Sequence, residues 1–188
     1  MMMENLALFD SLDEQTAVRF TGRLNVLDRL SRQMIGVVVI KDGEVLRCDY
    51  RGVFGLKAFY NMAIESAQLV LQDFVVEPEI ISEELREIHY PYPVLKARAR
   101  EAIERFTNYA SHRPPGHLRL MVRPDFLDQK QDAVSDAEFR VLCAITEWSK
   151  VDDLYRNCPL QDYEITEALV HLRKKEAIKT VAVRTAGQ

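Results

Sequence analysis

The strongest constraint on the fold is a run of strand-like segments and glycine turns between positions 21 and 58. Residues 34–40 are rich in β-branched side chains, a composition typical of a strand. Asp42 and Gly43 follow directly, and an Asp-Gly pair predicts a tight hairpin because glycine accepts the positive φ that the turn needs. We expect the return strand over 45–50 and a helix over 56–66. This stretch predicts a small antiparallel sheet that leads into a packed helix.

The flanking segments extend this α+β pattern. The spacing of Leu6, Phe9 and Leu12 predicts a short amphipathic helix from Glu4 to about position 18. Strands are expected from position 24 onward and over 69–76, where Pro78 ends the second one. The strand over 34–40 is apolar on both faces, which predicts cover on both sides. A long helix is expected from position 93 to about 110.

The C-terminal part predicts a different architecture. Ser135 and Glu138 have the spacing of a capping box, which starts a helix to about position 149. Two more helices are expected over 151–156 and from about 160 to 175, followed by a strand or wing over 177–183. Three helices and a wing predict a winged helix-turn-helix domain. We therefore expect a sheet-and-helix domain over 1–123, a polar linker over 124–133 and a winged-helix domain over 134–188.

Composition and charge exclude several classes of protein. The chain has 188 residues and a net charge of −4, which gives no general attraction to nucleic acid or anionic lipid. It contains no apolar run near the roughly 18 residues that a membrane-spanning helix needs, so we expect no membrane insertion. The three cysteines form no Cys-x-x-Cys motif and are expected to be reduced thiols, which predicts a cytoplasmic protein.

The sequence contains no recognisable catalytic or metal-binding motif. No Gly-x-Ser-x-Gly, Gly-x-Gly-x-x-Gly or phosphate-binding loop is present, and no histidine pair has the His-Glu-x-x-His spacing. The acidic pairs at 83–84 and 152–153 lie at expected helix starts, where they favour the helix dipole. We predict a protein that is not an enzyme and has neither a metal nor a cofactor.

The predicted winged helix raises the alternative of DNA binding. A recognition helix presents its N-terminal end to base edges and phosphates. Here that end carries Asp162, Glu164 and Glu167, and their carboxylates would be repelled by phosphate. A DNA-binding transcriptional regulator is therefore the second hypothesis, behind a domain used for contacts with proteins.

A basic and aromatic segment supplies the candidate partner-binding residues. Between positions 96 and 123 basic side chains outnumber acidic ones, and residues 89–93 form a stiff, tyrosine-containing stretch. Tyrosine is a common anchor in interfaces. The candidates are Tyr90, Tyr92, Lys96 and Arg100. The alternatives are local packing for the tyrosines and a solvated helix face for the cations.

The residues of the sheet resemble a known family. Thr21-Gly22-x-Leu24-x-Val26, Asp42-Gly43-x-Val45 and Gly55-x-x-Ala58 are similar to the PATAN domain at the N-terminus of PatA-type response regulators. The likeness covers about residues 6–109. It departs from the family at Asp49 and Tyr50, where alanine is more common. Family members often continue into a small winged-helix-like segment.

The resemblance implies a non-enzymatic interaction module in bacterial signalling, either two-component or motility related. No receiver domain is visible, so the chain would be a stand-alone adaptor. The implied partners are other proteins: a receiver domain, a small GTPase or a motor ATPase. Self-association as a homodimer is a further possibility that the sequence leaves open.

Overall fold

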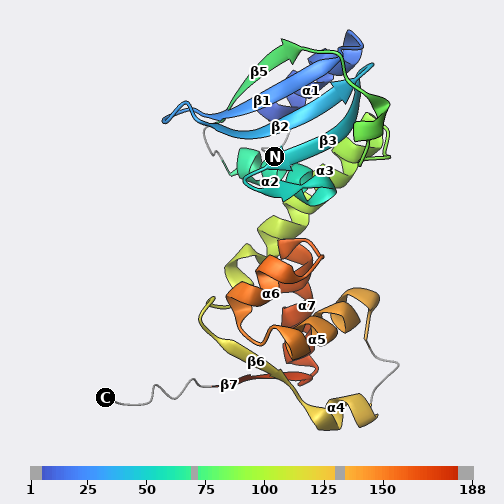
Figure 1. Ribbon diagram of the computed structural model, residues 1–188. Coiled ribbons are helices and arrows are strands. Elements are labelled where there is room, and N and C mark those ends of the chain that lie inside the picture. The colour runs from blue at the N-terminus through green and yellow to red at the C-terminus, as the bar shows by residue number, and fades with distance from the viewer. Residues whose placement is uncertain (1–5, 69–71, 130–133, 182–188) are drawn as a thin grey trace. The chain divides into compact units, whose positions relative to one another are not determined.

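The protein divides into two compact units. The computed structural model describes residues 6–68, 72–129 and 134–181 (Figure 1). The first unit comprises Met1–Glu104 and the second Arg105–Gln188, and the boundary falls inside helix α3 (Tyr92–Tyr109). The predicted α+β class is confirmed, because the first unit contains a five-stranded antiparallel sheet with packed helices.

The sheet of the first unit has the strand order β4-β3-β2-β1-β5. Asp42 and Gly43 adopt φ values of 51° and 82°, as the predicted hairpin between β2 and β3 requires. Arg51 and Gly52 form a second tight turn that adds the short strand β4. The strands are β1 (Gly22–Asp28), β2 (Met34–Lys41), β3 (Glu44–Tyr50), β4 (Val53–Phe54) and β5 (Gln72–Pro78).

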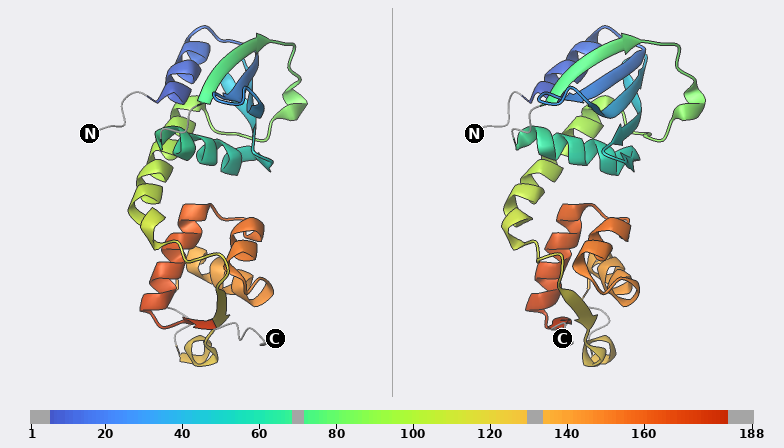
Figure 2. Two further views of the ribbon diagram at one scale, coloured as in Figure 1. Left: turned by 90° about the vertical axis from the view of Figure 1, so that its left-hand side faces the viewer. Right: turned by 60° about the vertical axis from the view of Figure 1, so that its left-hand side comes forward.

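Helices α1 (Ala7–Ala17) and α2 (Gly55–Ala67) lie on one side of this sheet (Figure 2). The residues of the central strands on that side include Leu24, Val38 and Cys48, which are fully buried. The other face is covered only in part, where Ile81 packs against Val39 and Leu46. The expectation that β2 is covered on both sides therefore holds at only one end of the strand. The predicted start of α1 at Glu4 lies outside the described residues.

Strand β5 returns to pair with β1 and becomes an edge of the sheet. A buried polar network holds its first residue: Gln72 Nε2 donates to the Tyr50 hydroxyl at 2.7 Å, and that hydroxyl donates to Glu65 Oε2 at 2.6 Å. Burial, reinforced by the Glu65 carboxylate, raises the pKa of Tyr50 to about 12. The network joins β5 to β3 and α2. Positions 69–71 of the predicted strand lie outside the described residues.

The segment after β5 leads into the long helix. Ser82 caps a single turn, η1 (Glu83–Leu85), by accepting a hydrogen bond from the Glu84 N–H at 3.3 Å. Helix α3 then begins at Tyr92, one residue before the predicted start at Pro93.

The second unit contains the three predicted helices. Ser135 and Glu138 form the predicted capping box, with the Glu138 N–H donating to Ser135 Oγ at 3.2 Å. The helices are α5 (Asp136–Glu147), α6 (Val151–Asn157) and α7 (Asp162–Lys174), after a 3-10 turn, η2 (Ala110–His112). Leu154, Ile165 and Leu172 are fully buried among them.

A strand that precedes these helices completes the unit. β6 (Arg119–Val122) pairs with β7 (Ile178–Val181) in an antiparallel ladder. The structure thus shows the three predicted helices and a two-stranded sheet in which β7 pairs with an upstream strand. Whether this amounts to a winged helix stays a prediction. Positions 182 and 183 of the predicted wing lie outside the described residues.

The division of the chain differs from the expected boundaries. The polar segment expected as a linker contains helix α4 (Pro124–Gln129), and its Phe126 packs in the core of the second unit. Leu120, expected in the first domain, belongs to the same core. The physical reason is that a few apolar side chains, here Leu120 and Phe126, can attach a mostly polar segment to a core.

Candidate protein-docking surface

Tyr92, one of the predicted partner-binding residues, lies in the core of the first unit. Its side chain is 3% exposed, and its hydroxyl donates to Asp13 Oδ1 at 2.8 Å. Burial, reinforced by the Asp13 carboxylate, raises the pKa of this phenol. Tyr92 therefore joins α3 to α1, which matches the local packing role left open by the sequence.

Lys96 and Arg100 extend the contact between these two helices. Lys96 Nζ lies 2.5 Å from Asp13 Oδ2 and 5.6 Å from the centre of the Phe9 ring. The Arg100 guanidinium lies 5.8 Å from the same ring. Burial raises the pKa of Asp13, but the hydrogen bonds from Lys96 and Tyr92 outweigh it and leave the pKa below its ordinary value. Lys96 and Arg100, two cations of the predicted basic segment, thus contact side chains of the first unit.

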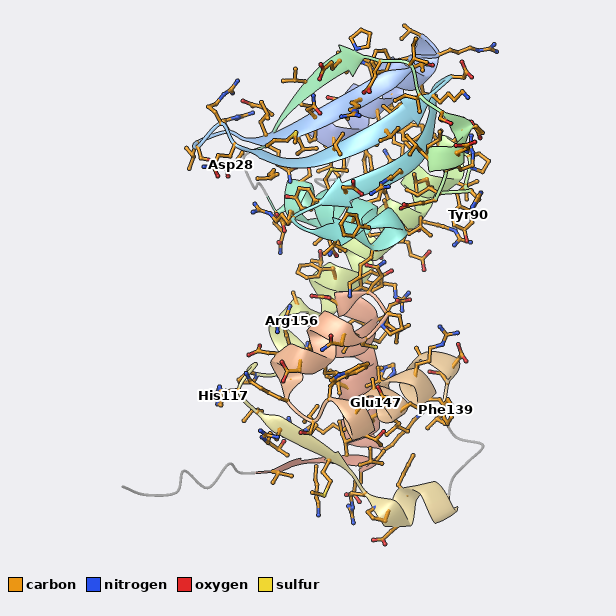
Figure 3. All side chains as sticks on the ribbon, in the orientation of Figure 1. Asp28, Tyr90, His117, Phe139, Glu147 and Arg156 are labelled. Atoms are coloured by element: carbon orange, nitrogen blue, oxygen red, sulfur yellow. The ribbon has the colours of Figure 1, made fainter. Side chains whose placement is uncertain are left out.

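Tyr90 is the most accessible aromatic of the predicted set. Tyr90, which Figure 3 labels, is half-buried. The Arg98 guanidinium lies 4.2 Å from the centre of its ring, within the range of a cation–π contact. The structure thus places Tyr90 beside Arg98, and places the other three candidates along the contact between α1 and α3. A partner-binding role for the four residues stays a prediction.

The outer edge of β5 offers a better docking surface. Glu79 donates its N–H to the Thr21 carbonyl at 3.5 Å. This bond shows which residues of β5 direct their main-chain N–H and C=O groups toward β1. Since main-chain groups alternate in direction along an antiparallel strand, Val75 and Glu77 turn toward β1. Phe74 and Val76 then point their N–H and C=O groups away from the sheet. The described residues supply no strand on that side.

The side chains along this edge are apolar and accessible. Val75 is 45% exposed on one face of β5 and Val76 is 42% exposed on the other. Ile80, just after the strand, is 97% exposed. Natural edge strands are commonly protected by charge, proline or a bulge. Here the charged or proline residues of β5 lie toward its ends, Asp73 near the start and Glu77 and Pro78 at the C-terminal end, and the stretch between them, residues 74–76, is apolar.

Exposed apolar residues continue onto the hairpin between β1 and β2. Leu30 and Met34 are exposed there, close to Asp28, which Figure 3 labels. The arginine side chains of the hairpin are held to β5, because Arg29 Nε donates to Asp73 Oδ1 at 2.8 Å and Arg32 pairs with the same carboxylate. We call the outer edge of β5 together with Leu30, Met34 and Ile80 the β5 edge surface.

The metal-ligating and thiol side chains of the described part of the chain are dispersed or buried. Within it, no group of three or more His, Cys, Asp and Glu side chains could hold a metal ion. The described cysteines are free: Cys48 and Cys158 are buried and Cys143 is exposed. Burial strongly raises the pKa of the Cys48 thiol, which leaves it protonated and unreactive.

The acidic side chains near the start of α7 bond to other residues of the second unit. Arg113 Nη1 lies 3.2 Å from Asp162 Oδ2, and Arg105 Nη2 donates to Glu167 Oε2 at 2.5 Å. Glu164 accepts a hydrogen bond from the Gln161 N–H at 2.9 Å. The three carboxylates expected to repel phosphate are thus used to hold α7 in place.

Comparisons with known proteins add no further constraint. No family model, curated protein or solved structure matches the chain. Among the described residues, no helix is both long enough and apolar enough to span a bilayer.

The sequence analysis did not find the β5 edge surface, because identifying an edge requires the order of the strands in the sheet. The pattern over 69–76 predicts a strand but does not say which neighbour it pairs with. The available signal was Pro78, since proline in a sheet is confined to edge strands, strand ends and bulges.

Proposed function

We propose that the protein is a non-enzymatic cytoplasmic adaptor that docks other proteins at the β5 edge surface. In this proposal a partner adds an extended segment alongside β5. The main chain supplies hydrogen bonds, and alternate side chains of the partner contact Val75 on one face and Val76 on the other. The bond-forming chemistry of an enzyme has no part in this function.

The observation that carries the proposal is the free edge itself. On its outer side, β5 pairs with no other strand in the described part of the chain, and main-chain groups left in this way on a seven-residue strand are a template for another strand that most proteins protect. Here the accessible stretch is flanked by exposed Leu30, Met34 and Ile80, which would add apolar contact area to the hydrogen bonds.

The resemblance to the PATAN family supports the same function and supplies the partner classes. These are a receiver domain, a small GTPase or a motor ATPase in a bacterial signalling or motility system. The resemblance, rather than any contact in the structure, selects these partner classes.

The test removes one outward donor without altering the ladder to β1. In Val76→Pro the outward N–H is lost, whereas Val76→Ala keeps the N–H and loses only part of the side chain. We expect the Val76→Pro protein to lose its partner in co-purification from the native cell, identified by mass spectrometry, and the Val76→Ala protein to retain it.

A control establishes that the variant is folded, and two results would contradict the proposal. Far-UV circular dichroism should be the same for Val76→Pro and Val76→Ala. Retention of every partner by a folded Val76→Pro protein would exclude docking at this edge. Light scattering that shows loss of a homodimer instead would identify the partner as a second copy of the chain.

The DNA-binding alternative rests on the succession α5, α6, α7 and β7, the order that a winged helix-turn-helix requires. Against it, Asp162 and Glu167 at the start of α7 are paired with arginines of the same unit. A salt-dependent shift of duplex DNA by the purified protein would favour this alternative.

A further inference from the structure

A groove in the second unit lies along the C-terminal half of α7. Its volume is about 800 Å³, and its walls come from α7, β7 and the segment from η2 to β6. Its lining residues lie within two stretches of the chain, 111–120 and 169–180. All of them belong to the second unit, so the groove is separate from the β5 edge surface.

The floor of the groove is apolar. Leu120, Leu169 and Ile178 are buried core residues that line the groove, and we call them its floor; Pro114 and Pro115 add further apolar lining. An apolar concavity of this volume suits one or two bulky side chains of a ligand, because such sites gain affinity by removing apolar surface from water.

The polar part of the lining is basic. It contains Arg113, Arg173, Lys174 and Lys179, with His112 beside them, and none of the lining residues is acidic. Arg113 is held by Asp162 and by the Tyr155 ring, 4.1 Å from its guanidinium carbon. In the described part of the chain, no ion pair is formed by Arg173, Lys174 or Lys179.

The opposite side of α7 shows that these unpaired cations are not general to the helix. There a smaller pocket is lined by both signs of charge, and two of its cations pair with carboxylates that also line it. Lys175 Nζ lies 2.7 Å from Glu138 Oε2, and Arg105 pairs with Glu167. The helix dipole favours cations near the C-terminus of α7 on every side of the helix. It therefore does not explain why the groove, unlike the smaller pocket, is lined by no carboxylate.

We propose that this groove binds an acidic peptide segment that carries a bulky apolar side chain. The apolar side chain occupies the floor, while flanking glutamates or aspartates pair with Arg173, Lys174 and Lys179. Charge complementarity of this kind gives specificity and rapid association. Duplex DNA would satisfy the cations but leave the apolar floor empty, so a peptide accounts for both parts of the lining. The adaptor would then have a second docking site, of different chemistry.

The experiment measures fluorescence anisotropy of a labelled peptide on the full chain. The probe is a short peptide of glutamates and aspartates with one central phenylalanine, and its partner probe has alanine at that centre. We expect saturable binding of the phenylalanine peptide that weakens as salt rises, and binding at least about tenfold weaker for the alanine peptide, which is about 1.4 kcal/mol.

Charge reversal at the groove provides the second arm. Lys174 and Lys179 are exposed, so Lys174→Glu/Lys179→Glu leaves the core intact, and we expect it to weaken binding by more than about tenfold. The matched control, Arg140→Glu/Arg156→Glu, changes the net charge equally at exposed positions outside the groove and should bind as the wild type does.

Distinct results would overturn the proposal. The site is not the groove if the two double variants bind the peptide equally, and no acidic peptide site exists if neither probe binds. Tighter, salt-dependent binding of a random duplex DNA that is lost in Lys174→Glu/Lys179→Glu would reassign the groove to nucleic acid. Because Val76→Pro leaves the groove unchanged, its peptide binding should equal that of the wild type even if docking at β5 fails.

Discussion

The two units present surfaces of opposite character. On the first unit, charged side chains near the β5 edge surface pair with one another: Arg29 with Asp73, and Arg23 with Glu79. The groups that remain accessible there are main-chain groups and apolar side chains. On the second, Lys174 and Lys179 remain without a described partner above an apolar floor. A net charge of −4 conceals this difference, which lies in the pairing of charges rather than in their number.

This comparison predicts that the units can be perturbed separately, and the sole tryptophan makes that measurable. Trp148 packs against the core of the second unit, so its fluorescence reports the unfolding of that unit. Far-UV circular dichroism reports both units.

The largest expected effect is that of Gly22→Ala on the first unit. A Cβ at position 22 would lie 2.3 Å from the carbonyl oxygen of Glu77, on β5, and the backbone φ there is +155°. We expect a loss of about 3 kcal/mol or more in the stability of the first unit, because β1 and β5 must separate. The dichroism midpoint in urea should fall while the Trp148 midpoint stays. Equal shifts of both midpoints would show that the units unfold together.

Glu138→Ala should have a somewhat smaller effect, confined to the second unit. Its carboxylate is 3% exposed and accepts hydrogen bonds from Lys175 Nζ and from the Ser135 N–H at 2.6 Å. Removing it takes away the ion pair with Lys175 and breaks the capping box, for which we expect a loss of about 2 kcal/mol in the Trp148 transition. The control is Asp136→Ala, an exposed member of an i,i+4 pair, which should cost less than about 0.5 kcal/mol.

Tyr92→Phe tests whether this predicted contact residue is structural. The ring is kept and the hydroxyl that donates to Asp13 is lost, so we expect a loss of about 1 kcal/mol in the first unit. Partner capture should be unchanged. Tyr90→Phe, which keeps the contact of the ring with Arg98, is the matched substitution and should leave the urea midpoint where it is. Unchanged stability of Tyr92→Phe together with a lost partner would favour a docking role instead.

The smallest effect is a pH dependence of the second unit. Burial raises the pKa of Glu138, but the hydrogen bonds from Lys175 and Ser135 outweigh it and leave the pKa below the ordinary 4.5. The stabilisation of the folded second unit by the Glu138 carboxylate is therefore fully present above pH 4.5 and is lost as pH falls through the lowered pKa. A pKa difference of one between the folded and unfolded states corresponds to about 1.4 kcal/mol. In Glu138→Gln the acid limb of the Trp148 stability curve should be flatter. A wild-type limb of the same slope would show that other groups dominate it.

Local signals were sufficient to predict most elements of the fold. The Asp42–Gly43 turn and the Ser135 cap are decided by a few neighbouring residues, and both were predicted correctly. Two long-range pairings were not predicted: β5 with β1, and β6 with β7. A strand pattern specifies which side chains share a face, but it does not specify which strand lies alongside.

The same limit explains what was missed at the candidate surfaces. Tyr92 and Lys96 have the composition of an interface, and only the packing of α1 against α3 shows that Asp13 engages both. Conversely, Arg173 and Lys174 are adjacent cations in the sequence, and the groove that they line becomes visible only when β7 and the segment around Pro114 lie beside them.

The ladder between β6 and β7 places Arg119 opposite Val181. The polypeptide thus enters and leaves the three-helix region at adjacent points, and a short covalent bridge could join these points without disturbing the core. Folds whose ends meet in this way tolerate being inserted into the loops of other proteins and being cut open elsewhere. A fragment that started at Val134 would lack the partner of β7 and would expose Ile178, so an autonomous module must begin upstream of Arg119.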